Sequence, residues 1–127
     1  MKKVLFVCVN NARRSQMATI IFNHFAKKAK AESAGLLPAS EVDKRVITVL
    51  QEIKIKPSQE LLPRQFTEEM IKEADLVISF GCLDQKLIPP AKFREWQIEP
   101  PLNLDDFRQL RDRLIKKVKE LIAENNF

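Results

Sequence analysis

The sequence predicts an α/β fold in which one domain forms a three-layer sandwich, a four-stranded parallel sheet with helices on both faces. Two apolar runs, 4–7 and 75–80, are typical of central strands that are buried on both sides. Strand-like segments around 32–34 and 94–98 alternate with segments whose apolar residues recur at helical spacing. Strands that alternate with helices in this way form parallel sheets, with the ligand site at the carboxyl ends of the strands.

Local signals place the helices. We expect the first helix to begin at Ser15 and to end in the basic cluster 27–30, because cations favour a helix C-terminus. Ser40 and Thr67 are candidate N-caps for a second helix and a short third one, and Asn103 is the candidate N-cap of the last helix. The last helix carries one apolar stripe, formed by Phe107, Leu110, Leu114, Val118 and Leu121.

The clearest chemical signal follows the first strand. Cys8 ends this strand, five residues come next, and Arg14 and Ser15 open the first helix. A strand, loop and helix in this order aim successive backbone N–H groups and the positive end of the helix dipole at one point, which suits an oxyanion. The same field and the charge of Arg14 stabilise a thiolate, the reactive form of cysteine. The loop therefore combines a nucleophile with an anion site.

The side chains of the loop have separate tasks in this interpretation. Arg14 can donate two N–H groups to two oxygens of a tetrahedral anion, and Ser15 can donate a hydrogen bond to the Cys8 sulfur. Asn11 suits the left-handed backbone that a loop without glycine still needs. We expect the anion to be bound by Val9, Asn10, Asn11, Ala12, Arg13, Arg14 and Ser15.

The sequence Cys8-x5-Arg14-Ser15 after a first strand resembles the signature loop of the low-molecular-weight protein tyrosine phosphatases. Residues 15–18, Ser-Gln-Met-Ala, are similar to the thioredoxin-coupled arsenate reductase branch of that family. Further similarities are Ser-Ala-Gly at 33–35, the strand that ends in Cys82, Trp96, and the segment 106–112. The resemblance extends over nearly the whole chain, 1–127, and implies the phosphotyrosine phosphatase I-like fold.

The resemblance implies an arsenate reductase. Its Cys8 thiolate would attack arsenate, and Cys82 would then attack Cys8, release arsenite and leave a disulfide for an external thiol to reduce. Both cysteines fall at the carboxyl ends of predicted strands, which is a geometric reason to expect that they meet. No bound cofactor is expected, and the reductant is thioredoxin, glutaredoxin or a low-molecular-weight thiol.

Two departures from the family pattern leave other functions open. The family has an aspartate as general acid before a proline shortly after its tryptophan; here that place falls at Pro100, so Glu99 is the candidate acid, with the acids at 105–106 as substitutes. The third cysteine of thioredoxin-coupled reductases, a few residues after Cys82, is missing. The alternatives are a phosphatase that hydrolyses phosphotyrosine or aryl phosphates through phospho-Cys8, and a catalytically weak module that binds oxyanions or phosphoproteins.

Composition excludes several other classes of protein. The net charge of +5 suits an anionic substrate, but the basic residues are scattered along predicted helices without a nucleic-acid motif, so we expect no nucleic-acid partner. No apolar run approaches the roughly 18 residues of a membrane span. The two cysteines lie far apart with no CxxC pair, which argues against a metal site. We expect a cytoplasmic monomer.

Overall fold

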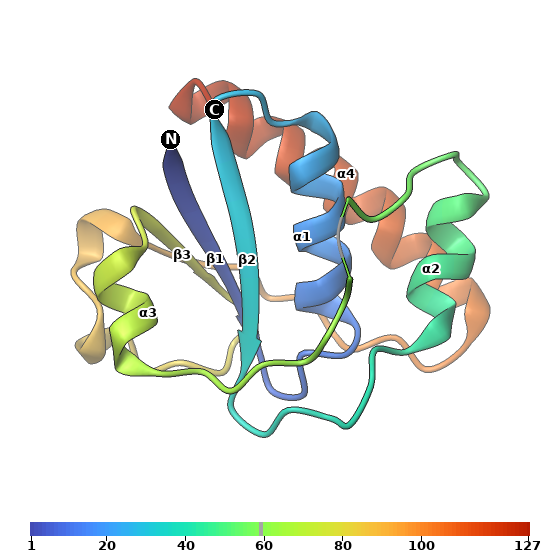
Figure 1. The fold of residues 1–127 in the computed structure, drawn as a ribbon, viewed down its shortest axis with the longest axis horizontal. Helices are drawn as coiled ribbons and strands as arrows, with labels where there is room; N and C mark the ends of the chain where they lie inside the picture. Colours follow the sequence, from blue (N-terminus) through green and yellow to red (C-terminus); the bar gives the residue numbers. More distant parts are fainter. Residues whose placement is uncertain (59) are drawn as a thin grey trace.

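The computed structural model describes residues 1–58 and 60–127. Its centre is a parallel four-stranded sheet in the order β2-β1-β3-β4, so the carboxyl ends of all strands lie at one edge. The strands are β1 (Lys2–Cys8), β2 (Ala29–Gly35), β3 (Leu76–Ser79) and β4 (Phe93–Glu95). The helices are α1 (Arg14–Phe25), α2 (Lys44–Gln51), α3 (Glu68–Glu73) and α4 (Leu104–Asn125), and Figure 1 shows how they surround the sheet.

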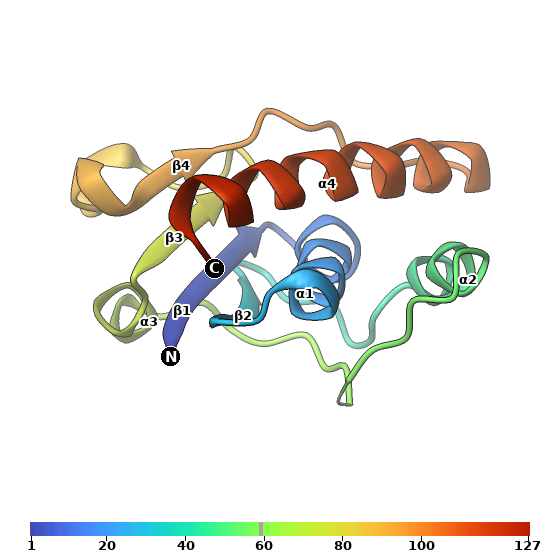
Figure 2. The ribbon, with the colours of Figure 1, turned by 90° about the horizontal axis from the view of Figure 1, so that it is seen from above.

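The elements form three layers. Helices α1 and α4 cover one face of the sheet, and α3 lies on the other face (Figure 2). Helix α2 packs against α4, at the side of that layer. This arrangement confirms the α/β fold with a parallel four-stranded sheet that the alternation of strands and helices predicts.

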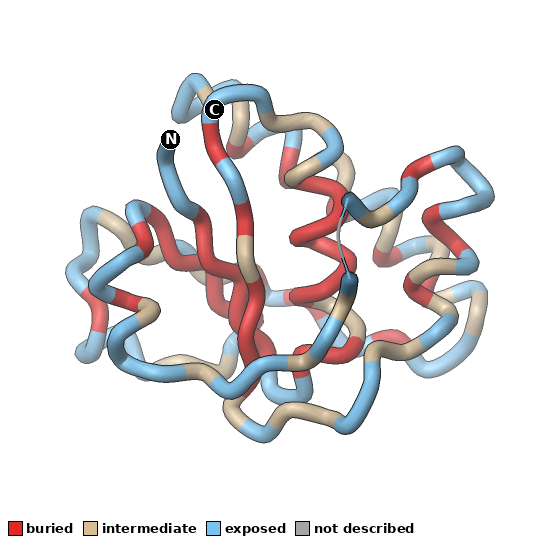
Figure 3. The backbone as a smooth tube through the Cα atoms, viewed as in Figure 1, coloured by how far each residue is buried: buried red, intermediate tan, exposed pale blue. Residues whose placement is uncertain are grey.

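Side chains of β1 alternate between two apolar clusters, as the pleat of a strand requires. Val4, Phe6 and Cys8 belong to the larger cluster, beneath α1 and α4, whereas Leu5 and Val7 belong to a smaller one beneath α3. All five are buried, which explains the continuous apolar run in the sequence (Figure 3). The part of β1 that leads to Cys8 is therefore enclosed on both faces of the sheet.

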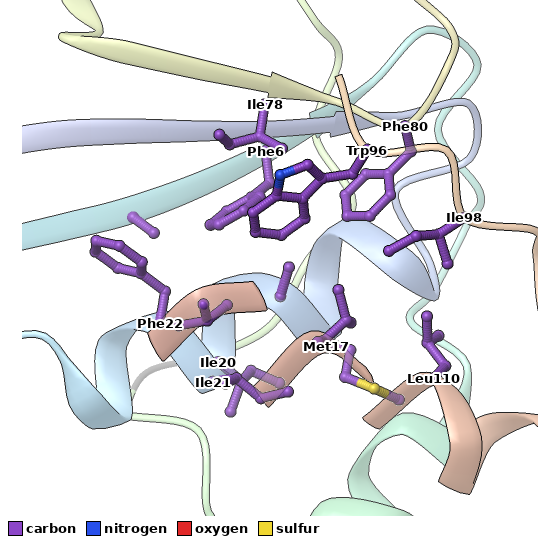
Figure 4. Packing of buried hydrophobic residues seen from close by; sticks show 14 of the residues in the cluster. Phe6, Met17, Ile20, Ile21, Phe22, Ile78, Phe80, Trp96, Ile98 and Leu110 are labelled. Carbon is purple, nitrogen blue, oxygen red and sulfur yellow. The ribbon is translucent and has the colours of Figure 1, made fainter. Parts of the chain in front are cut away.

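An aromatic group fills the larger cluster near the carboxyl edge. The Trp96 ring lies beside those of Phe6 and Phe80, with centroid separations of 5.7 and 6.0 Å (Figure 4). Tilted and edge-to-face arrangements at such distances are favourable. Trp96 therefore packs the chain that leaves β4 against the ends of β1 and β3.

Two elements end earlier than the sequence predicts. Helix α1 ends at Phe25, because the backbone turns extended at Ala26, and Lys30 of the expected basic cluster lies in β2. Strand β4 ends at Glu95. After the Trp96 N–H donates to the Ser79 carbonyl oxygen, the chain leaves the sheet. The late strand is therefore shorter than the expected 94–98.

The predicted caps have mixed outcomes. Asn103 caps α4 as expected, since its side chain accepts a hydrogen bond from the backbone of Asp106. The cap of α2 is Asp43 and not Ser40, and Thr67 precedes α3 without a side-chain capping bond. The apolar stripe of α4 is buried throughout, as predicted. None of the helices in ranges 1–58 and 60–127 is both long and apolar enough to cross a membrane.

Candidate active site

The loop between β1 and α1 is held from outside by the segment that follows β2. Carbonyl oxygens of the loop accept hydrogen bonds from backbone N–H groups of that segment: Leu36 to Cys8, Leu37 to Val9, Ala39 to Asn10 and Asp43 to Ala12, at N···O distances of 3.4, 2.9, 2.9 and 3.0 Å. A carbonyl and the following N–H point in opposite directions across a planar peptide. Carbonyls turned outward therefore turn N–H groups inward.

Those inward N–H groups are available to a ligand. Within the described residues, the N–H groups of 9–13 donate to no partner. The first turn of α1 adds further N–H groups that a helix leaves unpaired at its start, together with the positive end of its dipole. We call residues 8–15 the anion loop, because this array of donors suits an oxyanion.

Asn11 fixes the shape of the anion loop. Asn11 is buried. Its backbone is in the left-handed conformation that the sequence predicts, with a φ of 50°. Its side-chain oxygen accepts hydrogen bonds from the Arg64 backbone N–H at 2.8 Å and from Gln16 at 3.2 Å. A backbone N–H can only donate, so the amide nitrogen of Asn11 must face Ser15 Oγ, 2.7 Å away.

That orientation determines how Ser15 bonds to Cys8. The Cys8 Sγ and Ser15 Oγ atoms are 2.9 Å apart, and both residues are buried. Because the Ser15 oxygen already accepts a hydrogen from Asn11, and its hydroxyl has no other acceptor among the described residues, its hydrogen points to the sulfur. A donor at this distance stabilises a Cys8 thiolate.

Arg14 extends across the carboxyl edge of the sheet. Its Nη1 donates to the carbonyl oxygens of Phe80 and Ile98, at 3.3 and 2.9 Å. The guanidinium also lies over the Phe80 ring, 5.8 Å from its centroid. Nε and Nη2 form no hydrogen bond within the described residues, so they can donate to two oxygens of an anion. The arginine is thus fixed by one nitrogen and free at two.

Cys82 lies in the turn after β3, at the same edge. Its N–H donates to Ser79 Oγ at 3.1 Å, and its thiol donates to the Val7 carbonyl oxygen at 3.4 Å. Burial raises the pKa of the Cys82 thiol above its ordinary value. Cys82 packs against the small cluster beneath α3, whereas Cys8 belongs to the large cluster. The two free thiols therefore share an edge but lie on opposite faces of the sheet.

The sequence pattern of the low molecular weight phosphotyrosine protein phosphatases matches residues 3–126. The chain belongs to this family. A glutaredoxin arsenate reductase from Synechocystis is 34% identical over 98% of both chains. The structure of a thioredoxin-dependent arsenate reductase from Corynebacterium glutamicum has a TM-score of 0.82 and 32% identity. The match covers 98% of this chain and 61% of the Corynebacterium chain. A low molecular weight protein tyrosine phosphatase from T. tengcongensis has a TM-score of 0.85 and 25% identity, over 98% of this chain and 99% of its own.

The place of the family's acid is occupied by Pro100, and Glu99, the candidate acid, precedes it. Glu99 is exposed and follows Ile98, whose carbonyl binds Arg14, and it has no hydrogen bond or ion pair within the described residues. It borders a cavity of about 470 Å³ whose lining includes no residue of the anion loop. The two other candidate acids, Asp105 and Asp106, have partners near the start of α4. Asp106 accepts a hydrogen bond from the Leu102 backbone N–H, and Asp105 forms an ion pair with Arg108 at 3.7 Å. Of these three candidates, Glu99 is thus the one whose carboxylate has no partner within the described residues.

Sequence reasoning did not single out Asp43. Its carboxylate binds Arg45 and Arg13, with N···O distances of 2.9 and 3.1 Å, and these bonds, the one from Arg45 foremost, lower the pKa of Asp43 to about 2. The side chain of Arg13 is thereby held by Asp43, which follows the anion loop in the chain, through its Nε atom. The local signal was an aspartate directly before a helix, which is a common N-cap.

Proposed function

We propose that the chain is a thiol-dependent arsenate reductase in which Cys8 attacks arsenate and Cys82 resolves the adduct. The observation that carries the proposal is the second free thiol, which lies at the same sheet edge as the anion loop. A phosphatase reaction requires Cys8 alone. The relatives named arsenate reductases, at 34% and 32% identity, support the same choice.

The first step is nucleophilic attack on arsenic. Arsenate binds through its oxygens to the N–H groups of 9–13 and to the free nitrogens of Arg14. The Cys8 thiolate forms a bond to arsenic, and one oxygen leaves as water after it takes a proton, for which Glu99 is the candidate donor. Ser15 releases its hydrogen bond to the sulfur as the negative charge moves from sulfur to the arsenate oxygens.

The second step transfers two electrons to arsenic. Cys82 first loses its proton and then attacks the Cys8 sulfur, so that a disulfide forms and the bond between sulfur and arsenic breaks. The electron pair of that bond stays on arsenic, which leaves as arsenite. An external thiol, either a small molecule or thioredoxin or glutaredoxin, then reduces the disulfide. No bound cofactor takes part in this scheme.

A phosphatase is the second candidate, because the family and the anion loop both favour it independently of Cys82. In that reaction Cys8 attacks the phosphorus of an aryl phosphate or phosphotyrosine, and water hydrolyses the phospho-cysteine. The sequence has no tyrosine, and Trp96 is buried in the core, so any aromatic wall of the site has to come from phenylalanine.

A dual assay on three proteins separates these functions. Wild type, Cys8→Ser and Cys82→Ser are compared for arsenate-dependent thiol consumption and for hydrolysis of an aryl phosphate. The proposal predicts that both variants lose arsenate turnover. If Cys82→Ser instead keeps full activity on the aryl phosphate and wild type does not consume arsenate, the phosphatase function replaces it. Anion binding without either activity would indicate the binding module.

A further inference from the structure

The chain has only two cysteines, so reduction of the proposed disulfide has to begin from outside. After one turnover under the proposed function, Cys8 and Cys82 are joined, and no third thiol of this chain can receive the disulfide. A thiolate from another molecule must therefore attack one of the two sulfurs directly. The choice between them decides which residue carries the mixed disulfide and which face of the protein the reductant approaches.

Access favours Cys82. Cys8 is 3% exposed and is enclosed by the anion loop and by the cluster beneath α1 and α4. Cys82 is only partly buried, in a turn next to Gly81, which is exposed. A Cβ placed on Gly81 would have only Gln97 Oε1, 3.9 Å away, as a neighbour within 4 Å. The space beside residue 81, next to Cys82, is therefore open.

The leaving group also favours attack at Cys82. In thiol exchange, the sulfur that is better stabilised as a thiolate leaves faster. Cys8 has a close donor in Ser15 at 2.9 Å and lies where the free N–H groups of the anion loop converge. Cys82 has Ser79 Oγ at 3.7 Å and faces the Val7 carbonyl oxygen, which disfavours a negative charge. Burial, which raises the pKa of Cys82, acts in the same direction.

We propose that the external thiol attacks the Cys82 sulfur and expels the Cys8 thiolate, so that the mixed disulfide forms on Cys82. The inference rests on the proposed function. The reductant thiolate bonds to Cys82 Sγ, the bond between the two cysteines breaks, and its electron pair leaves on Cys8. A second reductant thiol attacks the sulfur of the first, which releases Cys82 as a thiolate that takes up a proton. Two thiols are oxidised for each disulfide reduced.

Peptide mapping tests this order of attack. The disulfide is formed in the wild-type protein with diamide, which needs no arsenate, and glutathione is then added and quenched with acid at short times. Trypsin separates the cysteines into the peptides 4–13 and 73–86. We expect glutathione on peptide 73–86 in about tenfold excess or more over peptide 4–13. Glutathione mainly or equally on peptide 4–13 would overturn the inference, as would failure of diamide to join the two cysteines.

A matched pair of serine variants gives a second readout. Ser15→Ala and Ser79→Ala each remove a hydroxyl beside one cysteine. If Cys8 is the leaving group, Ser15→Ala slows the opening of the diamide-formed disulfide several-fold, and Ser79→Ala changes it little. The reverse pattern contradicts the inference. The diamide experiments contain no arsenate, so they do not depend on the proposed reaction. If the disulfide opens at Cys82, but arsenate fails to oxidise the protein in a separate assay, only the proposed function is refuted.

Discussion

Gly35, the last residue of β2, lies directly against Asn11 of the anion loop. A Cβ atom on residue 35 would be 2.8 Å from the Asn11 Cβ and 2.8 Å from the Val9 carbonyl oxygen. These atoms belong to the loop itself, so they cannot move without changing the positions of its N–H groups. The close approach of strand and loop therefore depends on the missing side chain.

Replacement of Gly35 by alanine tests this dependence. We expect Gly35→Ala to reduce the free energy of unfolding by about 1–3 kcal/mol, the usual cost of overpacking, and to weaken phosphate binding as the loop shifts. Urea unfolding and phosphate inhibition of arsenate turnover measure the two effects. Gly81→Asn is the control for phosphate binding, because residue 81 has open space and asparagine is among the side chains least strained at its φ of 79°. Equal behaviour of the two variants would refute the role of Gly35.

Neighbouring arginines provide a sharper test of the anion site. Arg14→Lys keeps the charge but loses the planar pair of donors, so we expect phosphate affinity to fall by about 10–100-fold. Arg13→Lys should change it less than about threefold, because the Arg13 side chain is paired with Asp43 outside the loop. Competitive inhibition by phosphate measures both. Similar losses in the two variants would mean that the Arg13 side chain also binds the anion.

The resolving step should depend on pH through Cys82. Only the thiolate attacks, and burial raises the pKa of this thiol, so less thiolate is present at neutral pH than for an ordinary cysteine. In single turnovers we expect the rate of disulfide formation to increase with pH and to continue increasing above pH of about 8.5, the ordinary thiol value. Stopped-flow measurement of thiol loss tests this. A rate that is constant from pH 7 upward would show that Cys82 is already ionised.

Asp43 should stabilise the fold in a pH-dependent way. Its pKa falls from 3.8 to about 2 on folding, so its contribution is fully present above pH 4 and is lost as the pH falls towards 2. The carboxylate is largely enclosed, and we expect Asp43→Asn to lower the free energy of unfolding by about 1–2 kcal/mol at pH 7. Urea unfolding of both proteins should show this difference shrinking below pH 4. A difference that stays constant down to pH 3 would assign the effect to packing.

Much of the site could be predicted because its signals are local. Cys8, Arg14 and Ser15 lie within one strand, loop and helix, and the preference of Asn11 for a left-handed backbone is a property of the residue itself. The buried stripe of α4 follows from helical periodicity alone. Short-range patterns of this kind need no knowledge of the rest of the fold.

The remaining features depend on contacts that are distant in sequence. The bond from the Arg64 backbone to Asn11 joins residues 53 positions apart. Serine and aspartate are similarly good N-caps, and the contacts of Asp43 with the Ala12 carbonyl oxygen and with Arg13 are distant in sequence, so the local pattern does not distinguish residue 43 from Ser40. The side of the sheet taken by Cys82 could not follow from strand alternation, because β3 ends at Ser79 and Gly81 reverses the chain with a positive φ.

If Cys8 and Cys82 act together on arsenate, one turnover oxidises both thiols, and mass analysis of a single turnover detects this. Fully reduced protein is mixed with excess arsenate, without any external thiol, and analysed for intact mass, free thiols and released arsenite. We expect wild type to lose both of its thiols and to release one arsenite per chain, and Cys82→Ser to release none. Wild type that keeps both thiols free and yields no arsenite would show that the two cysteines do not reduce arsenate together.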